Sequence, residues 1–344
     1  MYQKTQLNTT QLGHTGLEIT RVGFGAWAIG GGGWSFGWGG QDDADSETAI
    51  RRALDLGVTW VDTAAVYGLG HSEEVVGRAI AALPAGDRPR VFTKCGLAWD
   101  AALPMVPARR VLAPDSIRRE CEASLRRLGV DVIDLYQFHW PDESGIPVEE
   151  SWGAMLDLKR QGKVRCCGVS NFDAGLLERC ERVGHVDSLQ PPFSLLNRGT
   201  AAELLPWCAA HGTGVIVYSP MQSGLLTDSF SAGRVAAMAA DDWRRSSDDF
   251  NTPRLERNLA LRDSLRPVAE RHGVTVAAVA VAWALSFEAV TGAIVGARSP
   301  SQVEGWVAAA GVRLSEADLD EISAAVERTG AGSGPSRPPR PPAA

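Results

Sequence analysis

Four side chains able to take part in proton transfer follow predicted strands in the first half of the chain. Asp62 ends the segment VTWVD, Tyr67 lies five positions later in AAVYG, Lys94 ends VFTK and His139 ends YQFH. A tyrosine phenol has a pKa of about 10, and a nearby ammonium group lowers it toward neutral pH, where general acid–base catalysis is most effective. A carboxylate keeps the lysine charged, and an imidazole either hydrogen-bonds the substrate oxygen or shares the proton. These residue types predict reduction of a carbonyl group, or its reverse, with Tyr67 as proton donor or acceptor.

The joint placement of the four residues carries this interpretation, because each alone has a structural explanation. An aspartate at a strand end commonly caps a turn or helix, and a single lysine or histidine there is usually structural. The carboxyl ends of consecutive parallel strands meet at one rim, where barrel enzymes hold their active sites. Four such residues at one rim therefore indicate a site.

Short apolar runs alternate with amphipathic helical stretches along the whole chain, which predicts parallel strands joined by crossover helices. Leu-Gly-Val at 56–58 and 128–130 places a glycine between helix and strand. Eight such units in one chain predict an α/β fold, a single-domain (β/α)8 TIM barrel. The predicted strands are 21–25, 58–61, 91–93, 132–138, 164–169, 188–190, 214–218 and 293–295, and the predicted helices are 46–56, 73–82, 115–128, 148–161, 174–183, 200–210, 253–272, 276–287 and 301–310.

Three kinds of segment lie outside this repeat. Residues 30–40 form a Gly/Trp-rich loop after the first strand, and residues 226–251 form a long loop after the seventh. We expect the barrel to span residues 12–328, with residues 1–11 as an N-terminal extension. The Gly/Pro-rich tail, residues 329–344, has the composition of a disordered or loosely draped segment.

Composition and charge exclude several classes of protein. A formal net charge of −7 without a basic run argues against nucleic acid as a partner. The polar N-terminus has no secretory signal, and the longest apolar stretch, residues 274–285, is too short to span a bilayer, so we expect no membrane association. Six scattered cysteines show no metal-binding spacing, which predicts reduced thiols, no metal site and a cytoplasmic protein. No feature indicates a particular oligomeric state.

Several segments resemble the aldo-keto reductase family in that family's order, over roughly residues 12–326. They are LGHTGLEITRVGFGAWAIGGG, VDTAAVYGLGHSEEVVGRAI, FTKCG, DLYQFHWPD, GVSNF, VIVYSPMQSGLLT and IVGARSPSQV. The resemblance implies that Asp62, Tyr67, Lys94 and His139 are the catalytic residues. It further implies a nicotinamide site, with the carboxamide held by Ser170, Asn171 and Gln190, the ring stacked on Tyr218 near Trp27, the pyrophosphate along Ser219, Met221, Ser223 and Leu225, and the adenosine phosphate at Gly296, Arg298 and Gln302.

Arg298 bears on the form of the cofactor. A cation at a helix start is unfavourable for the helix dipole, but it suits a site that receives a phosphate. We therefore expect NADP(H), with NAD(H) as the alternative. Two departures from the family pattern concern the same region. Asp228-Ser229 stand where many relatives have Gly and a basic residue, so a cationic contact to the cofactor is either missing or supplied by Arg234 or Arg298. After Gln302, Gly305-Trp306 stand where many relatives have residues that touch the adenine.

A rival dinucleotide motif is present near the N-terminus. Gly23, Gly25 and Ala28 fit the G-x-G-x-x-A fingerprint of doubly wound folds. That fingerprint opens a helix directly after its strand, whereas a glycine-rich loop follows here. We therefore interpret the match as accidental.

Tryptophans in the predicted loops after strands suggest the character of the substrate. An aromatic wall would accept an aromatic aldehyde or ketone, or stack on a sugar ring, although any one of these residues could simply pack a loop. The expected substrate pocket consists of Trp27, Trp34, Trp99 and Trp140.

Three functions fit these residues. The first is a reductase of aldehydes or ketones that uses NADPH. The second is a sugar or alcohol dehydrogenase that runs the same chemistry in the oxidative direction. The third is a cofactor-binding regulatory subunit, of which the potassium-channel β subunits are the family's example; the Pro-rich stretch 337–342 would then suit a polyproline-binding partner.

Overall fold

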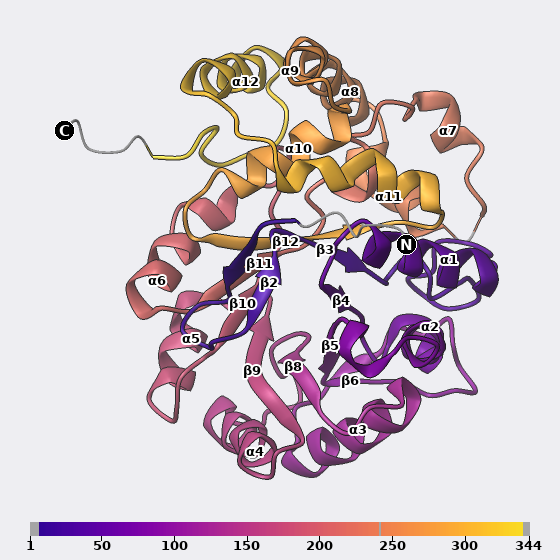
Figure 1. Ribbon diagram of the computed structural model, residues 1–344, viewed down its shortest axis with the longest axis vertical. Coiled ribbons are helices and arrows are strands. Elements are labelled where there is room, and N and C mark those ends of the chain that lie inside the picture. Colours follow the sequence, from indigo (N-terminus) through magenta and orange to yellow (C-terminus); the bar gives the residue numbers. More distant parts are fainter. Residues whose placement is uncertain (1–6, 241, 340–344) are drawn as a thin grey trace.

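The computed structural model describes residues 7–240 and 242–339, and within them eight parallel strands close into a barrel. Helices surround the strands on all sides (Figure 1). This arrangement confirms the predicted (β/α)8 class. In order around the barrel, the strands are β10 (Ser188–Gln190), β11 (Gly214–Val217), β12 (Val290–Gly296), β3 (Val22–Gly25), β4 (Trp60–Asp62), β5 (Arg90–Cys95), β8 (Ile133–Phe138) and β9 (Val164–Ser170).

The surrounding helices begin and end close to the predicted positions. Pro114 is the first residue of α3. Gly129, with a φ of 64°, ends this helix, as the Leu-Gly-Val sequence at 128–130 predicted. Helix α12 was not among the predicted helices. Ser315 and Asp318 form a reciprocal capping box at its start. The helices are α1 (Asp43–Asp55), α2 (His71–Ala81), α3 (Pro114–Leu128), α4 (Val148–Arg160), α5 (Ala174–Glu181), α6 (Leu204–His211), α7 (Ala232–Ala236), α8 (Arg254–Ser264), α9 (Arg266–His272), α10 (Val276–Leu285), α11 (Pro300–Trp306) and α12 (Glu316–Thr329).

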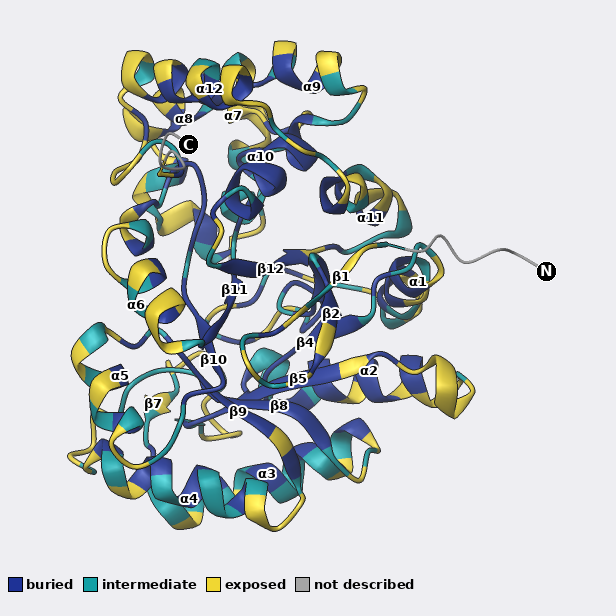
Figure 2. Cartoon of the chain, turned by 60° about the vertical axis from the view of Figure 1, so that its left-hand side comes forward, coloured by how far each residue is buried: buried dark blue, intermediate teal, exposed yellow. Residues whose placement is uncertain are grey.

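The core has two layers. Most buried apolar side chains lie between the strands and the helices, and α10 is buried along its entire length (Figure 2). A smaller cluster fills the barrel interior around Trp60 and Phe92. The hairpin of β1 (Thr9–Gln11) and β2 (Glu18–Thr20) adds Leu12, Leu17 and Ile19 to this inner cluster. Within the described residues no single helix has the length and hydropathy needed to cross a membrane; α8 and α9 together with α10 reach them, but that pair bends by 90°.

Three segments stand over the carboxyl ends of the strands. Residues 26–42 run from β3 to α1 without an intervening helix, which agrees with rejection of the G-x-G-x-x-A motif. A hairpin of β6 (Leu97–Ala98) and β7 (Arg109–Arg110) follows β5, and the Ser35 amide donates to the Pro104 carbonyl at 3.1 Å to join these two loops. The long loop after β11 contains α7 and three short 3-10 helices: η4 (Gln222–Gly224), η5 (Trp243–Ser246) and η6 (Asp248–Phe250).

The C-terminal tail contains no helix or strand over residues 331–339, as its composition predicts, but this part lies against the body of the protein. Arg337 forms ion pairs with Glu316 and Asp320 of α12. The described half of the Pro-rich stretch is thus engaged within the chain, and residues 340–344 lie outside the described residues.

Gly23 provides a test of the inner core. A Cβ atom at this position would lie within 2.2–2.4 Å of three ring atoms of Trp60, which is fully buried and donates to the Thr20 carbonyl at 2.8 Å. We predict that Gly23→Ala lowers the free energy of unfolding by at least about 2 kcal/mol, because a packed interior resists added volume.

Gly153, inside α4, has no heavy atom within 4 Å of its Cβ position and serves as the control. Gly153→Ala should leave stability unchanged or raise it by up to about 1 kcal/mol. Urea denaturation of both variants makes the comparison, and equal stabilities would contradict the packing argument.

Candidate active site

Lys94 of β5 and Asp62 at the end of β4 form a buried ion pair at the mouth of the barrel. Lys94 Nζ lies 2.5 Å from Asp62 Oδ1, and the lysine side chain is fully buried. The same ammonium donates to the Thr63 carbonyl at 2.9 Å and to the Tyr67 hydroxyl at 3.4 Å. The lysine therefore has an acceptor for each of its three N–H groups.

Two glutamines complete the surroundings of Asp62. Gln190 Nε2 of β10 donates to Asp62 Oδ2 at 2.9 Å, and Gln137 Nε2 of β8 donates to the same oxygen at 3.3 Å. Gln190 Nε2 also donates to Gln137 Oε1 at 3.1 Å. A buried charge is tolerated only with such partners, so four strands jointly hold the carboxylate in place.

Tyr67 and His139 face each other beside this ion pair. Their ring centroids are 5.5 Å apart and nearly perpendicular. Tyr67 opens the short 3-10 helix η1 (Tyr67–Gly70), in which Leu69 has a φ of 55°. His139 follows β8, and its amide donates to the Cys95 carbonyl at 2.9 Å. The structure thus brings Asp62, Tyr67, Lys94 and His139 together at the strand ends, as the sequence predicted.

The direction of the Tyr67 pKa differs from the expectation. Burial and the negative charge of Asp62 raise the pKa of Tyr67 well above its ordinary value. The expected lowering by Lys94 is wrong for this arrangement, because burial of the phenol disfavours its charged form and the Asp62 carboxylate beside Lys94 acts in the same direction. Burial lowers the pKa of Lys94, and Asp62 opposes that effect. A protonated phenol at neutral pH is suited to donate a proton.

His139 is held in its neutral form. Burial lowers the pKa of His139 well below 6.5, and the charges of Lys94 and Arg110 act in the same direction. A neutral imidazole offers one N–H donor and one acceptor nitrogen. It can therefore hydrogen-bond an oxygen at the mouth without adding a charge.

The residues expected around a nicotinamide carboxamide are joined to one another by hydrogen bonds. Tyr218 donates its hydroxyl to Asn171 Oδ1 at 2.9 Å, and Asn171 Nδ2 donates to the His139 carbonyl at 2.9 Å. Ser170 Oγ donates to the Gln190 carbonyl at 2.7 Å. The predicted stacking residue is therefore tied through Asn171 to the backbone of His139.

Unusual backbone conformations concentrate at the predicted cofactor residues. In the described part of the chain, five non-glycine residues have positive φ: Leu69, Asn171, Ser219, Gln222 and Ser223. Such conformations cost free energy and tend to persist at functional sites. Three of the five fall in the stretch expected to line a pyrophosphate, where Met221 is half-buried and Leu225 is fully buried. The backbone of this region fits a site built for a ligand.

Arg298 lies just before α11, as expected, but its guanidinium already donates hydrogen bonds to acceptors within the protein. Its Nε donates to Gln41 Oε1 at 2.6 Å, its Nη1 to the Trp38 carbonyl at 3.2 Å, and its Nη2 to the Gly40 carbonyl. Its backbone amide donates to Gln302 Oε1 at 2.8 Å, and Gly296 is exposed at the end of β12. Arg298 therefore joins the start of α11 to the loop after β3.

Sequence reasoning missed the residues that connect this loop to the long loop after β11. Trp243 stacks on Trp27 with ring centroids 5.4 Å apart, and the Arg244 guanidinium lies 4.4 Å from the centroid of Trp38. Arg244 is buried, pairs with Asp242 at 2.6 Å, and donates to the Ser223 carbonyl at 3.2 Å. Arg244 thus links the stretch 219–225, through Ser223, to the loop after β3, through Trp38.

The indole N–H groups of Trp38 and Trp243 are buried without an acceptor among the described residues. A buried donor without a partner is costly, and a dinucleotide is rich in acceptor oxygens. These two donors are therefore consistent with a nicotinamide dinucleotide along the two loops.

The four expected pocket tryptophans have different surroundings. Trp27 stacks on Tyr67 at 6.2 Å between ring centroids and donates to the Phe36 carbonyl at 3.1 Å. Trp34 is buried beside Tyr67, and Trp99 packs half-buried in the same cluster. The guanidinium carbon of Arg110 lies 4.2 Å from the ring centroid of Trp140. Trp27, Trp34 and Trp99 thus form an aromatic group around Tyr67, with Trp140 beside His139 in the sequence.

A closed parallel barrel with polar side chains gathered at the carboxyl ends of its strands is the architecture of TIM-barrel enzymes. Within the described residues no group of three His, Cys, Asp or Glu side chains is placed to hold a metal ion. All six cysteines are buried and unpaired.

Comparison with known proteins agrees with this class. The family model described as "Aldo/keto reductase family" matches residues 21–327. The aldo-keto reductase YhdN of Bacillus subtilis (strain 168) is 36% identical over 93% of this chain and 94% of its own length. The NADH-specific methylglyoxal reductase of Escherichia coli (strain K12) is 35% identical over 92% and 98%. A solved glycerol dehydrogenase, AKR11B4 from Gluconobacter oxydans, superimposes with a TM-score of 0.83 at 36% identity, covering 97% of this chain and 98% of that one. The chain belongs to the aldo/keto reductase family of oxidoreductases.

The depressed pKa of His139 predicts a pH dependence of stability. Below pH 6.5 the unfolded chain binds a proton at this imidazole that the folded protein does not, so the free energy of unfolding falls as the pH falls. His139→Gln lacks this effect. We predict that the variant gains about 1.4 kcal/mol relative to the parent protein between pH 7.5 and 5.5. Urea denaturation at several pH values measures this difference, and a constant difference would show that the pKa of His139 is the same in the folded and unfolded states.

Proposed function

We propose that the protein reduces an aldehyde or ketone to the alcohol, with a nicotinamide dinucleotide as cofactor and Tyr67 as the general acid. One observation carries the proposal: the Tyr67 hydroxyl lies 3.4 Å from a buried ammonium, beside a neutral histidine, at the carboxyl ends of the strands. When bound, the cofactor supplies the hydride. The protein supplies the proton and the orientation of the substrate.

The charges of the site assign a role to each residue. Tyr67 stays protonated at neutral pH because its pKa is raised, so its O–H is available to a carbonyl oxygen. Lys94, oriented by Asp62, lies 3.4 Å from the tyrosine oxygen and stabilises the negative charge that forms there when the proton leaves. His139 orients the carbonyl by a hydrogen bond.

NADP(H) is the form we propose, with NAD(H) as the alternative. A 2′-phosphate at Arg298 would exchange neutral carbonyl acceptors for an anionic one, and charge-assisted hydrogen bonds are the stronger kind. The relative in E. coli described as NADH-specific keeps the alternative open.

The oxidative direction is the second candidate. It is supported by the likeness to a glycerol dehydrogenase, because the same tyrosine accepts the proton when an alcohol is oxidised. The aromatic group around Tyr67 suits the apolar face of a sugar as well as an aromatic carbonyl. Six unpaired buried thiols support a reducing compartment such as the cytoplasm.

Tyr67→Phe tests the role of the phenol. We predict that kcat for carbonyl reduction falls at least about a hundredfold, because a positioned general acid contributes about 10²–10⁴-fold. The dissociation constant of the cofactor should stay within about threefold. The assay follows NADPH and NADH oxidation with a panel of aldehydes and ketones.

Tyr136→Phe is the matched control, since Tyr136 lies on β8 but packs in the outer core layer. Its activity should remain within about twofold of the parent. Full activity in Tyr67→Phe would refute the assigned role, and NAD(P)+-dependent oxidation of polyols or sugars without carbonyl reduction would favour the second candidate.

Arg298→Met tests the choice of cofactor. If the guanidinium binds the 2′-phosphate, kcat/KM should fall at least about tenfold with NADPH and stay within about threefold with NADH. A tenfold change corresponds to about 1.4 kcal/mol of binding free energy. An equal loss with both cofactors would show that Arg298 acts only by holding Gln41 and its neighbours. A selective loss in Arg234→Met instead would move the phosphate contact to α7.

A further inference from the structure

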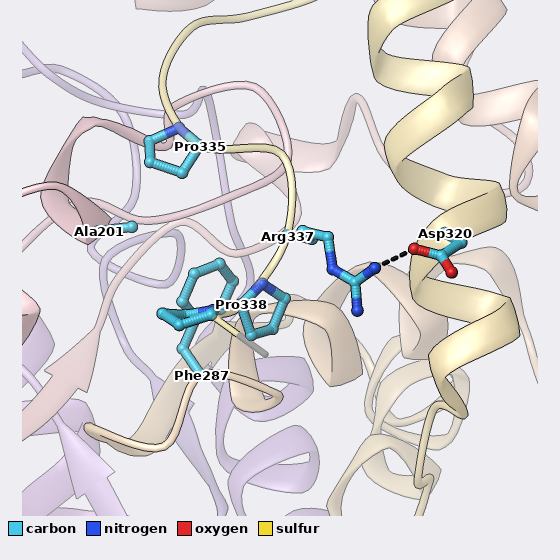
Figure 3. Close-up of a pocket in the computed structure, with 7 residues that line it drawn as sticks. Ala201, Phe287, Asp320, Pro335, Arg337 and Pro338 are labelled. Atoms are coloured by element: carbon cyan, nitrogen blue, oxygen red, sulfur yellow. Dashed lines mark hydrogen bonds and ion pairs between the residues drawn. The ribbon is translucent and has the colours of Figure 1, made fainter. Parts of the chain in front are cut away.

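The C-terminal segment forms a strap, residues 331–339, along the outside of the β10–α6 loop, residues 191–203. Asn197 and Ser333 form a parallel bridge, and the Arg198 amide donates to the Ser333 carbonyl at 2.9 Å. Farther along, Ser336 Oγ lies 2.6 Å from Ser323 Oγ of α12. Figure 3 shows Pro335 and Pro338 near Ala201 and Phe287, with Arg337 turned toward Asp320; these residues line a surface pocket of about 510 Å³.

Arg198 fastens the strap to the loop. The residue is 4% exposed, and its guanidinium donates to the Gly334 carbonyl at 3.0 Å, the Ala331 carbonyl at 3.0 Å and the Leu195 carbonyl. Its acceptors are therefore backbone carbonyls from both segments. Burial lowers the pKa of Arg198, which reflects the cost of placing a cation here. Loss of the strap would leave this buried charge with fewer acceptors.

The two backbones are in direct contact. A Cβ atom at Gly332 would lie 2.3 Å from the Leu196 carbonyl oxygen, and one at Gly334 would lie 2.5 Å from the Arg198 carbonyl carbon. Gly332 also has a φ of 63°, which side chains disfavour. These glycines allow the strap to lie flat on the loop, so the Gly-rich composition has a structural use.

The other side of the same loop supports the expected cofactor residues. The Tyr218 amide donates to the Pro191 carbonyl at 3.0 Å, and the Phe193 amide donates to the Tyr218 carbonyl at 3.1 Å. Ser194 Oγ donates to Gln222 Oε1 at 2.8 Å. The loop thus lies between the strap and the segment 218–225, in which Ser219, Gln222 and Ser223 have positive φ.

We propose that Arg198 is a positioning residue, which together with the strap fixes the β10–α6 loop and thereby sets the affinity of the protein for the nicotinamide cofactor. The proposal rests on the proposed function, because Tyr218 and residues 219–225 are taken as cofactor contacts. Its physical basis is preorganisation: a segment already held in its bound conformation loses less entropy when the ligand binds. Arg198 itself contacts neither Tyr67 nor the other residues of the mouth in the bonds described above.

The test compares four full-length variants. Arg198→Met removes the guanidinium, Arg198→Lys keeps a charge, and Gly332→Ala disturbs the strap from the other side. Arg271→Met is the matched control, because Arg271 is a half-exposed arginine that pairs with Asp318 and Glu321 of α12, and within the described residues its guanidinium bonds to neither the strap nor the β10–α6 loop. For each variant, calorimetry gives the dissociation constants of NADPH and NADH, and steady-state kinetics gives kcat at saturating cofactor. Hydrogen exchange gives the protection of residues 214–226.

In Arg198→Met and Gly332→Ala we expect cofactor affinity to fall about tenfold and exchange in residues 214–226 to accelerate at least about fivefold. The kcat at saturating cofactor should stay within about twofold, Arg198→Lys should recover part of the affinity, and Arg271→Met should match the parent protein. Unchanged cofactor affinity in Arg198→Met or in Gly332→Ala would overturn the proposal, even if exchange in residues 214–226 accelerates or the melting temperature falls.

The exchange measurement separates this proposal from the proposed function. If the parent protein binds neither NADPH nor NADH, the proposed function fails, and the claim about affinity fails with it. Faster exchange in residues 214–226 would then still support the positioning of this segment by Arg198. If Arg198→Met does not fold, Gly332→Ala and Arg198→Lys decide the question by the same readouts.

Discussion

The ion pair between Lys94 and Asp62 is the interaction on which the mouth of the barrel depends. Removing two charges from water is costly, and the cost is offset only if the remaining donors and acceptors are satisfied. Gln190 supplies one of these bonds from β10, which stands opposite β4 in the ring of strands. In an open sheet with this strand order, four spacings of about 4.8 Å would separate them by roughly 19 Å. The contact therefore requires a closed barrel, so fold and site depend on each other.

Burial, together with the carboxylate of this ion pair, determines the state of the Tyr67 phenol. An isolated ammonium would pull a nearby tyrosine toward the phenolate, but here the carboxylate offsets the ammonium and burial disfavours a further charge. The result is a neutral O–H that lies 3.4 Å from a cation; under the proposed function, this cation stabilises the charge that forms when the proton leaves. Burial keeps His139 neutral as well. The Tyr67 phenol and the His139 imidazole are thus both uncharged at neutral pH.

The sequence predicted the features that depend on local pattern. Strand and helix positions follow from hydrophobic periodicity, and Asp62, Tyr67, Lys94 and His139 could be placed together because parallel strands end at one rim. The partnership of Gln190 with Asp62 joins residues 128 positions apart and has no periodicity. Likewise, the contact of Arg244 with Trp38 joins two loops of irregular structure, and no pattern in either loop indicates it. The direction of the Tyr67 pKa depends on the burial of the phenol and on its closeness to Asp62, which residue types do not supply.

The tail illustrates a different limit. Its Gly/Pro composition predicted a disordered or loosely draped segment, and residues 331–339 contain no helix or strand, but composition does not reveal contact with another segment. The Cβ-free positions at Gly332 and Gly334 are used for close backbone approach, and the acceptors for Arg198 are carbonyls that every residue possesses. Such contacts leave no residue-type signature.

The aromatic contact between the two loops at the mouth also has an optical consequence. Trp27 and Trp243 lie with ring centroids 5.4 Å apart and planes inclined by 16°, while Trp38 stands edge-on to both. Indole chromophores this close couple their electronic transitions, and the coupling varies steeply with separation and angle. The near-ultraviolet circular dichroism signal of these tryptophans therefore depends on the relative position of the loop after β3 and the loop after β11, and it reports that position without an attached label.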